Sequence, residues 1–338
     1  MNLNRYSRQT VFPPIGVEGQ QKLFDARVAI IGVGALGTVI ANNLCRSGVG
    51  FLRIIDRDYV EWSNLQRQTL YQEQDAAEQL PKAVAAYQHL SKVNSEIVIE
   101  PVVDDVNSSN IENLIKDVDL VLDGSDNLEV RFLINEACHK YKIPWIYGGA
   151  IGSTGMTMNI IPGEGPCFRC LCPSDSEAGS TETCSTAGVL NMLTGVIASI
   201  ESAEAIKILI GSPDVRKDVF FIDLWDFSTQ VIEIPKDKDC PTCARSHYEY
   251  LSQTKGSYST SLCGRDSIQI VPGSPTNIDF EYISGKLKKV GTVKYNRFML
   301  SFDDGTRSFN LFPDGRAIIK NVKDEFAAKS VYSEYIGL

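Results

Sequence analysis

A glycine-rich turn near the start of the chain is the first feature that could do chemistry. Gly32, Gly34 and Gly37 form a G-x-G-x-x-G pattern between an apolar run and a helical pattern. Glycines at this spacing let backbone N–H groups approach a phosphate at the positive end of a helix. Asp56 ends the next apolar run, where a carboxylate can bond a ribose hydroxyl. The pattern predicts a nucleotide site without selecting the nucleotide; the alternative is a turn needed only for close packing.

Polar side chains that follow the ribose acid favour a triphosphate. Asp58 comes two residues later, a single loop then offers Asn64, Arg67 and Gln68, and Lys82 opens a predicted helix. An arginine presents a planar fork of donors to phosphate oxygens, and a lysine presents a point charge. A dinucleotide cofactor needs no such cluster after its ribose acid. Each charge alone could be a solvated surface group, but together they indicate one anion site.

Another candidate group follows a buried apolar run at 119–123. Asp126 and Asn127 come directly after it, within Gly124-Ser125-Asp126-Asn127. Ligands bind at the carboxyl edge of a parallel sheet, and a carboxylate there could hold Mg²⁺ against phosphate oxygens. We therefore assign both residues to the same predicted site.

Four cysteines form two C-x-x-C pairs, Cys167 with Cys170 and Cys240 with Cys243. Four thiolates make a closed tetrahedral zinc site, which is structural because no position remains for a substrate. The interval between the pairs is longer than in common zinc fingers, and a redox-active pair is the alternative. Cys184 lies in an aperiodic stretch just before a predicted helix, where a thiol pKa can be lowered. It is a candidate for covalent chemistry or only for positioning a partner.

The elements that must position these residues alternate between strands and helices. Such alternation predicts an α/β fold with a Rossmann-like, mostly parallel sheet, extended by antiparallel strands after residue 148. The predicted strands are 27–31, 51–55, 97–101, 119–123, 144–147, 154–161, 219–222 and 229–234. The predicted helices are 35–46, 80–93, 128–139 and 188–210.

The chain divides into a larger domain at 1–245 that carries all the candidate site residues, a linker at 246–265 and a small C-terminal α+β domain at 266–338. The last domain is expected to have the order βαβββα and receives no residue-level function. Its predicted strands are 266–271, 292–302, 307–312 and 316–322, and its predicted helices are 277–290 and 325–335.

Composition excludes several classes of protein. The 338 residues carry 33 Lys and Arg against 42 Asp and Glu, a net charge of −9, and no stretch is strongly basic. We therefore expect no nucleic-acid partner. The longest uncharged stretch contains several hydroxyl and amide side chains, which suits a buried helix better than a membrane span. An odd number of cysteines, nine, without an export signal predicts a reducing cytoplasm.

Taken together, these motifs resemble those of the ThiF/MoeB adenylyltransferases, the bacterial relatives of the ubiquitin-activating enzymes. The resemblance covers about residues 4–245 and rests on Arg5-Tyr6-Ser7-Arg8-Gln9, GVGALG, Asp56-x-Asp58, SNLQRQ, Lys82, SDN with Arg131, and the paired C-x-x-C. It implies ATP-dependent adenylation of the C-terminal glycine carboxylate of a small ubiquitin-fold sulfur carrier, with release of pyrophosphate. The carrier would serve thiamine-thiazole or molybdopterin synthesis, and Cys184 slightly favours the thiazole route.

The resemblance also implies roles for single residues. Gly34 and its neighbours would line the nucleotide, Asp56 would take the ribose, and Asp126 would serve Mg²⁺. Asn64, Arg67 and Lys82 would hold the phosphates. In a homodimer, Arg8 would act on the phosphates of the other subunit, and Cys184 would be a candidate for an acyl disulfide or thioester with the carrier. A cysteine desulfurase is a candidate further partner.

Three alternatives remain open on the sequence. An NAD-dependent oxidoreductase would use the glycine turn but not Arg67 or Lys82. A non-catalytic zinc scaffold would bind ATP without turnover. Relatives within the same class act on tRNA-linked or peptide carboxylates instead of a carrier protein.

Overall fold

In the computed structural model of this chain, the structure describes residues 2–173, 187–252, 258–261, 267–272 and 277–337. The chain divides into two compact units, Met1–Gln253 and Thr254–Leu338, and each is described by itself. Among the described residues, no helix is both long enough and apolar enough to cross a membrane.

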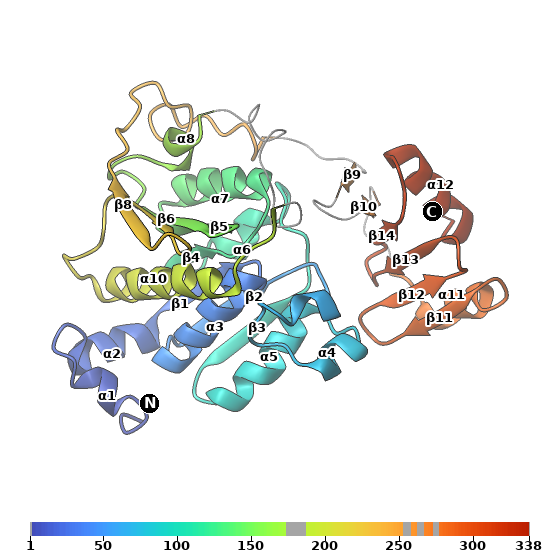
Figure 1. Cartoon of the computed structure of the whole chain (residues 1–338), viewed down its shortest axis with the longest axis horizontal. Helices are drawn as coiled ribbons and strands as arrows, with labels where there is room; N and C mark the ends of the chain where they lie inside the picture. Colours follow the sequence, from blue (N-terminus) through green and yellow to red (C-terminus); the bar gives the residue numbers. More distant parts are fainter. Residues whose placement is uncertain (1, 174–186, 253–257, 262–266, 273–276, 338) are drawn as a thin grey trace. The chain divides into compact units, whose positions relative to one another are not determined.

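Eight of the described strands form one sheet in the larger unit, in the order β3-β2-β1-β4-β5-β6-β7-β8 (Figure 1). Strands β1 to β5 are parallel, and β6 to β8 are added antiparallel. The strands are β1 (Arg27–Ile31), β2 (Phe51–Ile55), β3 (Val98–Val102), β4 (Leu120–Asp123), β5 (Trp145–Ile151), β6 (Thr154–Ile160), β7 (Val219–Asp223) and β8 (Ser228–Ile232). This confirms the predicted Rossmann-like sheet with its antiparallel extension. The strand order reverses between β1 and β4, which is where such sheets bind ligands.

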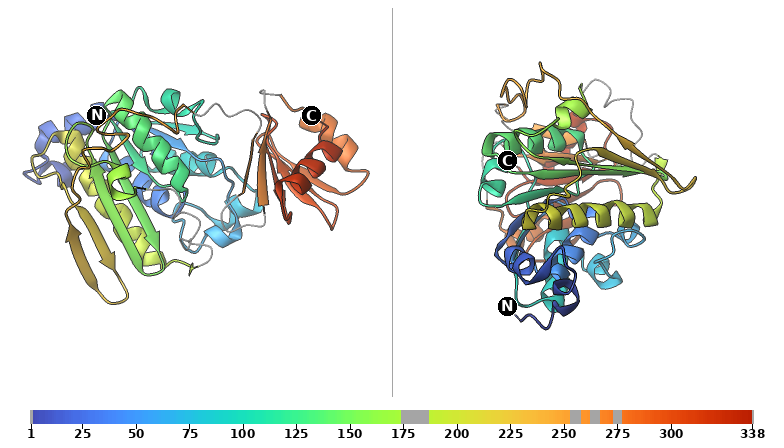
Figure 2. Two further views of the ribbon diagram at one scale, coloured as in Figure 1. Left: turned by 90° about the horizontal axis from the view of Figure 1, so that it is seen from above. Right: turned by 90° about the vertical axis from the view of Figure 1, so that its left-hand side faces the viewer.

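Helices cover both faces of this sheet, as the two views of Figure 2 show. Alternation along β1 explains the two layers: Val28 and Ile30 pack into one apolar core, while Ala29 and Ile31 pack into the other. The first core lies under α3 (Ala35–Ser47), α5 (Lys82–Val93) and α10 (Asn191–Ile210), and the second under α6 (Ile111–Ile115) and α7 (Leu128–Tyr141). Shorter elements are α1 (Ser7–Thr10), α2 (Gly16–Asp25), η1 (Trp62–Asn64), α4 (Glu73–Ala77) and α8 (Phe168–Leu171).

The long helix expected at 188–210 begins later than the sequence predicts. Gly152 N donates to Gly188 O at 2.9 Å, and Leu190 N donates to Gly152 O at 2.8 Å. The chain before α10 is therefore bonded to the β5–β6 turn and cannot also be helical.

The smaller unit contains an antiparallel sheet whose described strands have the order β11-β12-β13-β14-β10-β9. Its apolar core joins this sheet to α11 and α12. The elements are β9 (Tyr258–Ser261), β10 (Ser267–Val271), α11 (Phe280–Leu287), β11 (Thr292–Tyr295), β12 (Leu300–Asp303), β13 (Ser308–Leu311), β14 (Ala317–Lys320) and α12 (Glu325–Tyr335).

Three details of this unit differ from the expected pattern. The single strand expected at 292–302 is a hairpin, because Asn296 turns the chain: its side-chain oxygen accepts from Phe298 N at 2.8 Å and Met299 N at 3.0 Å. The segment 246–265, expected to be a linker, includes β9, which pairs with β10. Helix α11 begins at Phe280 because the Asp279 side chain caps it.

Candidate active site

Three glycines let the turn after β1 pack directly against the turn after β4. A Cβ on Gly32 would lie 2.6 Å from Gly124 O, and Gly32 also has a φ of +88°. A Cβ on Gly37 would lie 2.0 Å from Gly32 O. Such distances exclude any side chain, so Gly32, Gly37 and Gly124 are required by packing and backbone conformation.

Gly34 has a different environment, which points to a ligand. A Cβ built on Gly34 would meet nothing closer than 3.9 Å, and one of those nearest atoms is Nε2 of Gln68. Gly34 is the N-cap residue of α3, so the open space lies at the helix end that attracts anions. Gln68 is 4% exposed, and within the described chain its Oε1 has no hydrogen-bond partner. A buried amide beside open space at a helix N-terminus fits a polar ligand there.

The Asp56 carboxylate holds the glycine turn to the end of β2. Its two oxygens accept from Val33 N and from Asp58 N, each at 2.8 Å. Burial raises the pKa of Asp56, Lys82 opposes that rise, and the neighbouring Asp58 adds to it. The sequence placed Asp56 at this edge but gave no indication that both oxygens bond to backbone amides.

Lys82 lies beside two carboxylates at the start of α5. Its Nζ is 3.1 Å from Asp58 Oδ2, and its backbone N donates to Asp58 O at 2.9 Å. Lys82 is 5% exposed, so its charge lies in a poorly hydrated place. When ionised, Lys82, Asp56 and Asp58 together carry one net negative charge. An anionic ligand could therefore bind beside them only with the help of further cations.

The SNLQRQ segment begins within the short 3-10 helix η1 and places its polar side chains unequally. Asn64 is buried, and its Oδ1 accepts from Glu61 N at 2.9 Å. Arg67 is partly exposed, and its Nη1 donates to Ser63 O at 3.0 Å. Asn64 therefore stabilises the turn, while the arginine fork remains near the surface.

The loop after β4 rests on a buried ion pair. Arg131 Nε lies 2.8 Å from Asp123 Oδ2, and its Nη2 donates to Ser125 O and Gly148 O at 2.7 and 3.1 Å. Burial alone would lower the pKa of Arg131, but Asp123 raises it, and Asp126 adds to that rise. The exposed Asp126 carboxylate thus lies within the field of this arginine.

Three other residues predicted to serve the site are Asn127, Arg8 and Cys184. Asn127 caps α7, with Oδ1 accepting from Glu129 N at 2.9 Å, so its oxygen has a structural use that the sequence analysis missed. Arg8 is exposed on α1, and its side chain has no hydrogen bond or ion pair within the described residues of this single chain. Cys184 lies outside the described residues.

The four predicted zinc ligands come together. The sulfur atoms of Cys167, Cys170, Cys240 and Cys243 all lie within 4.8 Å of one another. The distance from Cys167 Sγ to Cys240 Sγ is 3.6 Å, and from Cys170 Sγ to Cys243 Sγ it is 3.5 Å. A tetrahedral ion with Zn–S bonds of about 2.3 Å separates its sulfurs by about 3.8 Å. The cluster therefore fits zinc in donor type and in size.

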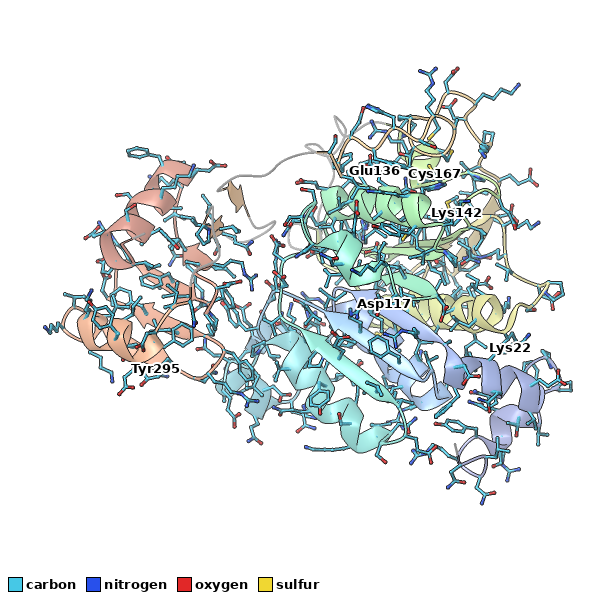
Figure 3. All side chains as sticks on the ribbon, turned by 180° about the vertical axis from the view of Figure 1, so that it is seen from behind. Lys22, Asp117, Glu136, Lys142, Cys167 and Tyr295 are labelled. Atoms are coloured by element: carbon cyan, nitrogen blue, oxygen red, sulfur yellow. The ribbon has the colours of Figure 1, made fainter. Side chains whose placement is uncertain are left out.

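A side chain from α7 supports this cluster and was not foreseen. Asn135 is fully buried, and its Nδ2 donates to Cys167 Sγ at 3.6 Å while its Oδ1 accepts from Phe168 N at 3.1 Å. Metal ligands are commonly oriented by such bonds. The next residue, Glu136, which is labelled with Cys167 in Figure 3, accepts from the backbone N atoms of 249–251 at 2.8 to 3.0 Å.

Glu201 on α10 is a buried carboxyl group that packs against Gly148 of β5. It is fully buried, and neither oxygen has a hydrogen-bond partner within the part of the chain that the structure describes. A Cβ on Gly148 would lie 1.9 Å from Glu201 Oε1, so β5 needs a glycine where this carboxyl packs. Burial, and then Asp123, raise the pKa of Glu201 well above its ordinary value. The carboxyl group is therefore protonated over a wide pH range.

We expect Glu201→Gln to raise the free energy of unfolding, relative to the wild type, by more at pH 8 than at pH 4. Between the low pKa of the unfolded state and the raised pKa of the folded state, the folded chain binds more protons, so wild-type stability falls as pH rises. A neutral amide removes that loss, about 1.4 kcal/mol for each unit of pKa elevation. Urea unfolding at both pH values measures the difference.

Glu204→Gln on the same helix is the matched control. Burial raises the pKa of Glu204, but hydrogen bonds from Lys207 and the Arg216 amide help to lower it by more than that rise. The pKa of Glu204 is therefore below its ordinary value. Its substitution should therefore destabilise at pH 8 and have little effect at low pH. Equal pH dependence for the two variants would contradict this interpretation of Glu201.

The chain is similar to known proteins over most of its length. The model of the ThiF family matches residues 6–242. The chain is 40% identical to the sulfur carrier protein ThiS adenylyltransferase of Bacillus subtilis, over 98% of this chain and 99% of that protein. It is 34% identical to the sulfur carrier protein adenylyltransferase of Thermus thermophilus, over 71% of this chain and 90% of that protein.

Solved structures resemble the larger part of the fold. The crystal structure of E. coli MccB with ATP has a TM-score of 0.63 and 24% identity, over 72% of this chain and 75% of that chain. At this identity the likeness shows the shared fold.

Proposed function

Because this chain belongs to the ThiF family, we propose that it adenylates the C-terminal carboxylate of a small ubiquitin-fold sulfur carrier. The observation that carries the proposal is the meeting of Gly34, Gln68 and the Asp56–Asp58–Lys82 group at the sheet's switch point. Full-length similarity to a ThiS adenylyltransferase supports the carrier as substrate. The reaction class is nucleotidyl transfer from ATP.

The proposed chemistry depends on positive groups near the reacting atoms and needs no general base. A carboxylate oxygen of the terminal glycine attacks the α-phosphorus of ATP, the bond to the β-phosphate oxygen breaks, and pyrophosphate leaves. Both reactants are anions, so they repel until positive groups offset their charge. Cations held in place beforehand supply this stabilisation, and binding supplies the alignment. No general base is needed, because the attacking carboxylate is already ionised at neutral pH.

Roles for single residues follow as part of the proposal. The N-terminal amides of α3 and Gln68 face the nucleotide across the open space at Gly34. Lys82 and Arg67 hold phosphate oxygens, and Lys82 must exchange part of its contact with Asp58 for the phosphates. Asp56 accepts from a ribose hydroxyl through the lone pairs that the backbone amides of Val33 and Asp58 leave unused. Asp126 would ligate Mg²⁺, which neutralises phosphate charge when it is bound.

Zinc at the four cysteines is proposed to be structural. All four positions of a tetrahedral ion would be filled by thiolates, so no site remains for a substrate. The ion would tie α8, which follows β6, to the segment after β8.

The roles proposed for the later steps of sulfur transfer rest on the resemblance to the ThiF/MoeB adenylyltransferases. Cys184 is proposed to attack the acyl adenylate of the carrier, so that AMP leaves: as a thiolate it would form a thioester, and as a persulfide, whose outer sulfur a cysteine desulfurase supplies, it would form an acyl disulfide. Thiazole synthesis is the favoured route, which agrees with the ThiS named for the Bacillus subtilis relative.

Carrier-dependent exchange of labelled pyrophosphate into ATP tests the function. Incubation with ATP and a ThiS-like carrier should give exchange, and mass spectrometry should find the carrier heavier by one AMP. A MoaD-like carrier in parallel measures the preference between routes. Exchange without a carrier, or binding of NAD in place of ATP, would refute the proposal.

A mixing experiment tests the proposed homodimer and the role of Arg8. Arg8→Ala and Lys82→Ala should each be inactive alone. If Arg8 serves the partner's site, a mixed dimer has one complete site, so equal mixtures should recover about a quarter of wild-type activity after subunit exchange. Size-exclusion chromatography confirms that the variants remain dimers. No recovery with proven exchange would show that Arg8 does not act across subunits.

A further inference from the structure

A ring of hydrogen bonds closes around the base of the proposed nucleotide site. Asp56 accepts from Val33 N and Asp58 N at 2.8 Å each, and Lys82 N donates to Asp58 O at 2.9 Å. The hydroxyl oxygen of Tyr71 completes the ring, 2.7 Å from Val33 O and 3.2 Å from Lys82 O. The ring joins the glycine turn, the end of β2 and the start of α5.

Tyr71 is a buried side chain whose hydroxyl has a defined task in this ring. It is 7% exposed, and burial raises the pKa of its hydroxyl well above the ordinary value, so the proton stays available for donation. A buried tyrosine hydroxyl must find a partner, and here both acceptors are backbone carbonyls of the two segments that face the nucleotide. No sequence pattern indicates this role, because an aromatic residue near a core ordinarily indicates packing.

We propose that Tyr71 is a positioning residue for adenylation, which fixes the glycine turn and the Lys82 helix at the separation that ATP requires. The inference rests on the proposed function. The two segments belong to different strand–helix units. On the other side of the ring they are joined by hydrogen bonds through the Asp56 carboxylate and the Asp58 backbone. One hydroxyl proton shared between carbonyl oxygens of both segments ties them together, so movement of either segment loses part of this contact. Loss of this bond should therefore weaken binding of the nucleotide more than binding of the carrier.

Tyr71→Phe tests the proposal, because it keeps the ring packing and removes only the hydroxyl. We expect KM for ATP to rise about tenfold, which is the effect of one buried hydrogen bond whose acceptor is left unpaired. KM for the carrier should stay within about twofold, and circular dichroism should match the wild type. The rise in melting temperature that saturating ATP gives the wild type should shrink in the variant.

Tyr87→Phe is the matched control, since it removes an exposed hydroxyl from α5 itself. It should behave as wild type in every assay. An unchanged KM for ATP in Tyr71→Phe would overturn the inference, and so would equal rises in both KM values. If wild-type enzyme lacks carrier-dependent exchange, the proposed function fails; the ATP-induced melting shift then still decides the role of Tyr71.

Discussion

Replacing Lys82 with alanine should lower carrier-dependent pyrophosphate exchange by about 10²–10³-fold, the usual cost of losing one preplaced charge-stabilising group. The reason lies in the local charge balance. Lys82 is the cation beside Asp58 and Asp56, and without it two carboxylates face an incoming triphosphate. The variant therefore loses an attraction and exposes a repulsion at the same place. Initial rates with ATP and carrier varied in turn measure both kcat and KM.

Lys92→Ala provides the comparison, since Lys92 is an exposed lysine on the same helix. Its exchange rate should equal that of the wild type. Lys82→Met, which fills the volume without the charge, should be as inactive as the alanine variant and should keep the wild-type circular dichroism. Strong activity in either Lys82 variant would refute the assignment of this lysine to the phosphates.

Replacing Cys167 with serine should remove the metal and lower the melting temperature by about 10 °C or more. Structural zinc contributes its binding free energy to folding, and a loss of several kcal/mol shifts a domain of this size by at least that amount. Cys167 is fully buried and accepts from Asn135, so a serine there leaves a polar group beside an incomplete ligand set. Zinc per chain, measured by atomic absorption, should fall from about one to nearly zero.

Cys172→Ser is the matched control for this experiment. Cys172 lies two residues after Cys170 but outside the four-sulfur cluster. Its substitution should leave zinc content and melting temperature unchanged. Retention of zinc by Cys167→Ser, or its loss from Cys172→Ser, would contradict the ligand assignment. Retained exchange activity in a zinc-free but folded variant would agree with a structural ion.

Much of the site could be predicted because its signals are local. A glycine turn between a strand and a helix, an acid at the next strand end and a C-x-x-C pair each specify short-range geometry. Parallel strands then bring their carboxyl ends to one edge, so Gly34, Asp56 and Lys82 had to lie near one another once the alternation was recognised. The order of the strands in the larger sheet, by contrast, was not predicted and came from the structure.

Hydrogen-bond partners from distant segments could not be predicted. A different miss was local: Asn64 and Asn127 were assigned to the nucleotide, although their side-chain oxygens accept from Glu61 N and Glu129 N, three and two residues away. Tyr71, Asn135 and Glu201 carried no signal at all, because a polar atom on a buried residue gains meaning only from what packs against it.

The sequence by itself determined the strand–helix alternation, the sheet edge proposed to bind the nucleotide and the two cysteine pairs that come together, since each depends on residue types at short spacing. Only the tertiary structure decided which glycines packing requires and that Gly34 is not one of them. It also decided that Lys82 is paired with Asp58 and that Tyr71 joins two loops. The physical reason is that burial, charge pairing and hydrogen bonding are properties of neighbours in space. Those neighbours come from chain segments whose separation no local pattern records.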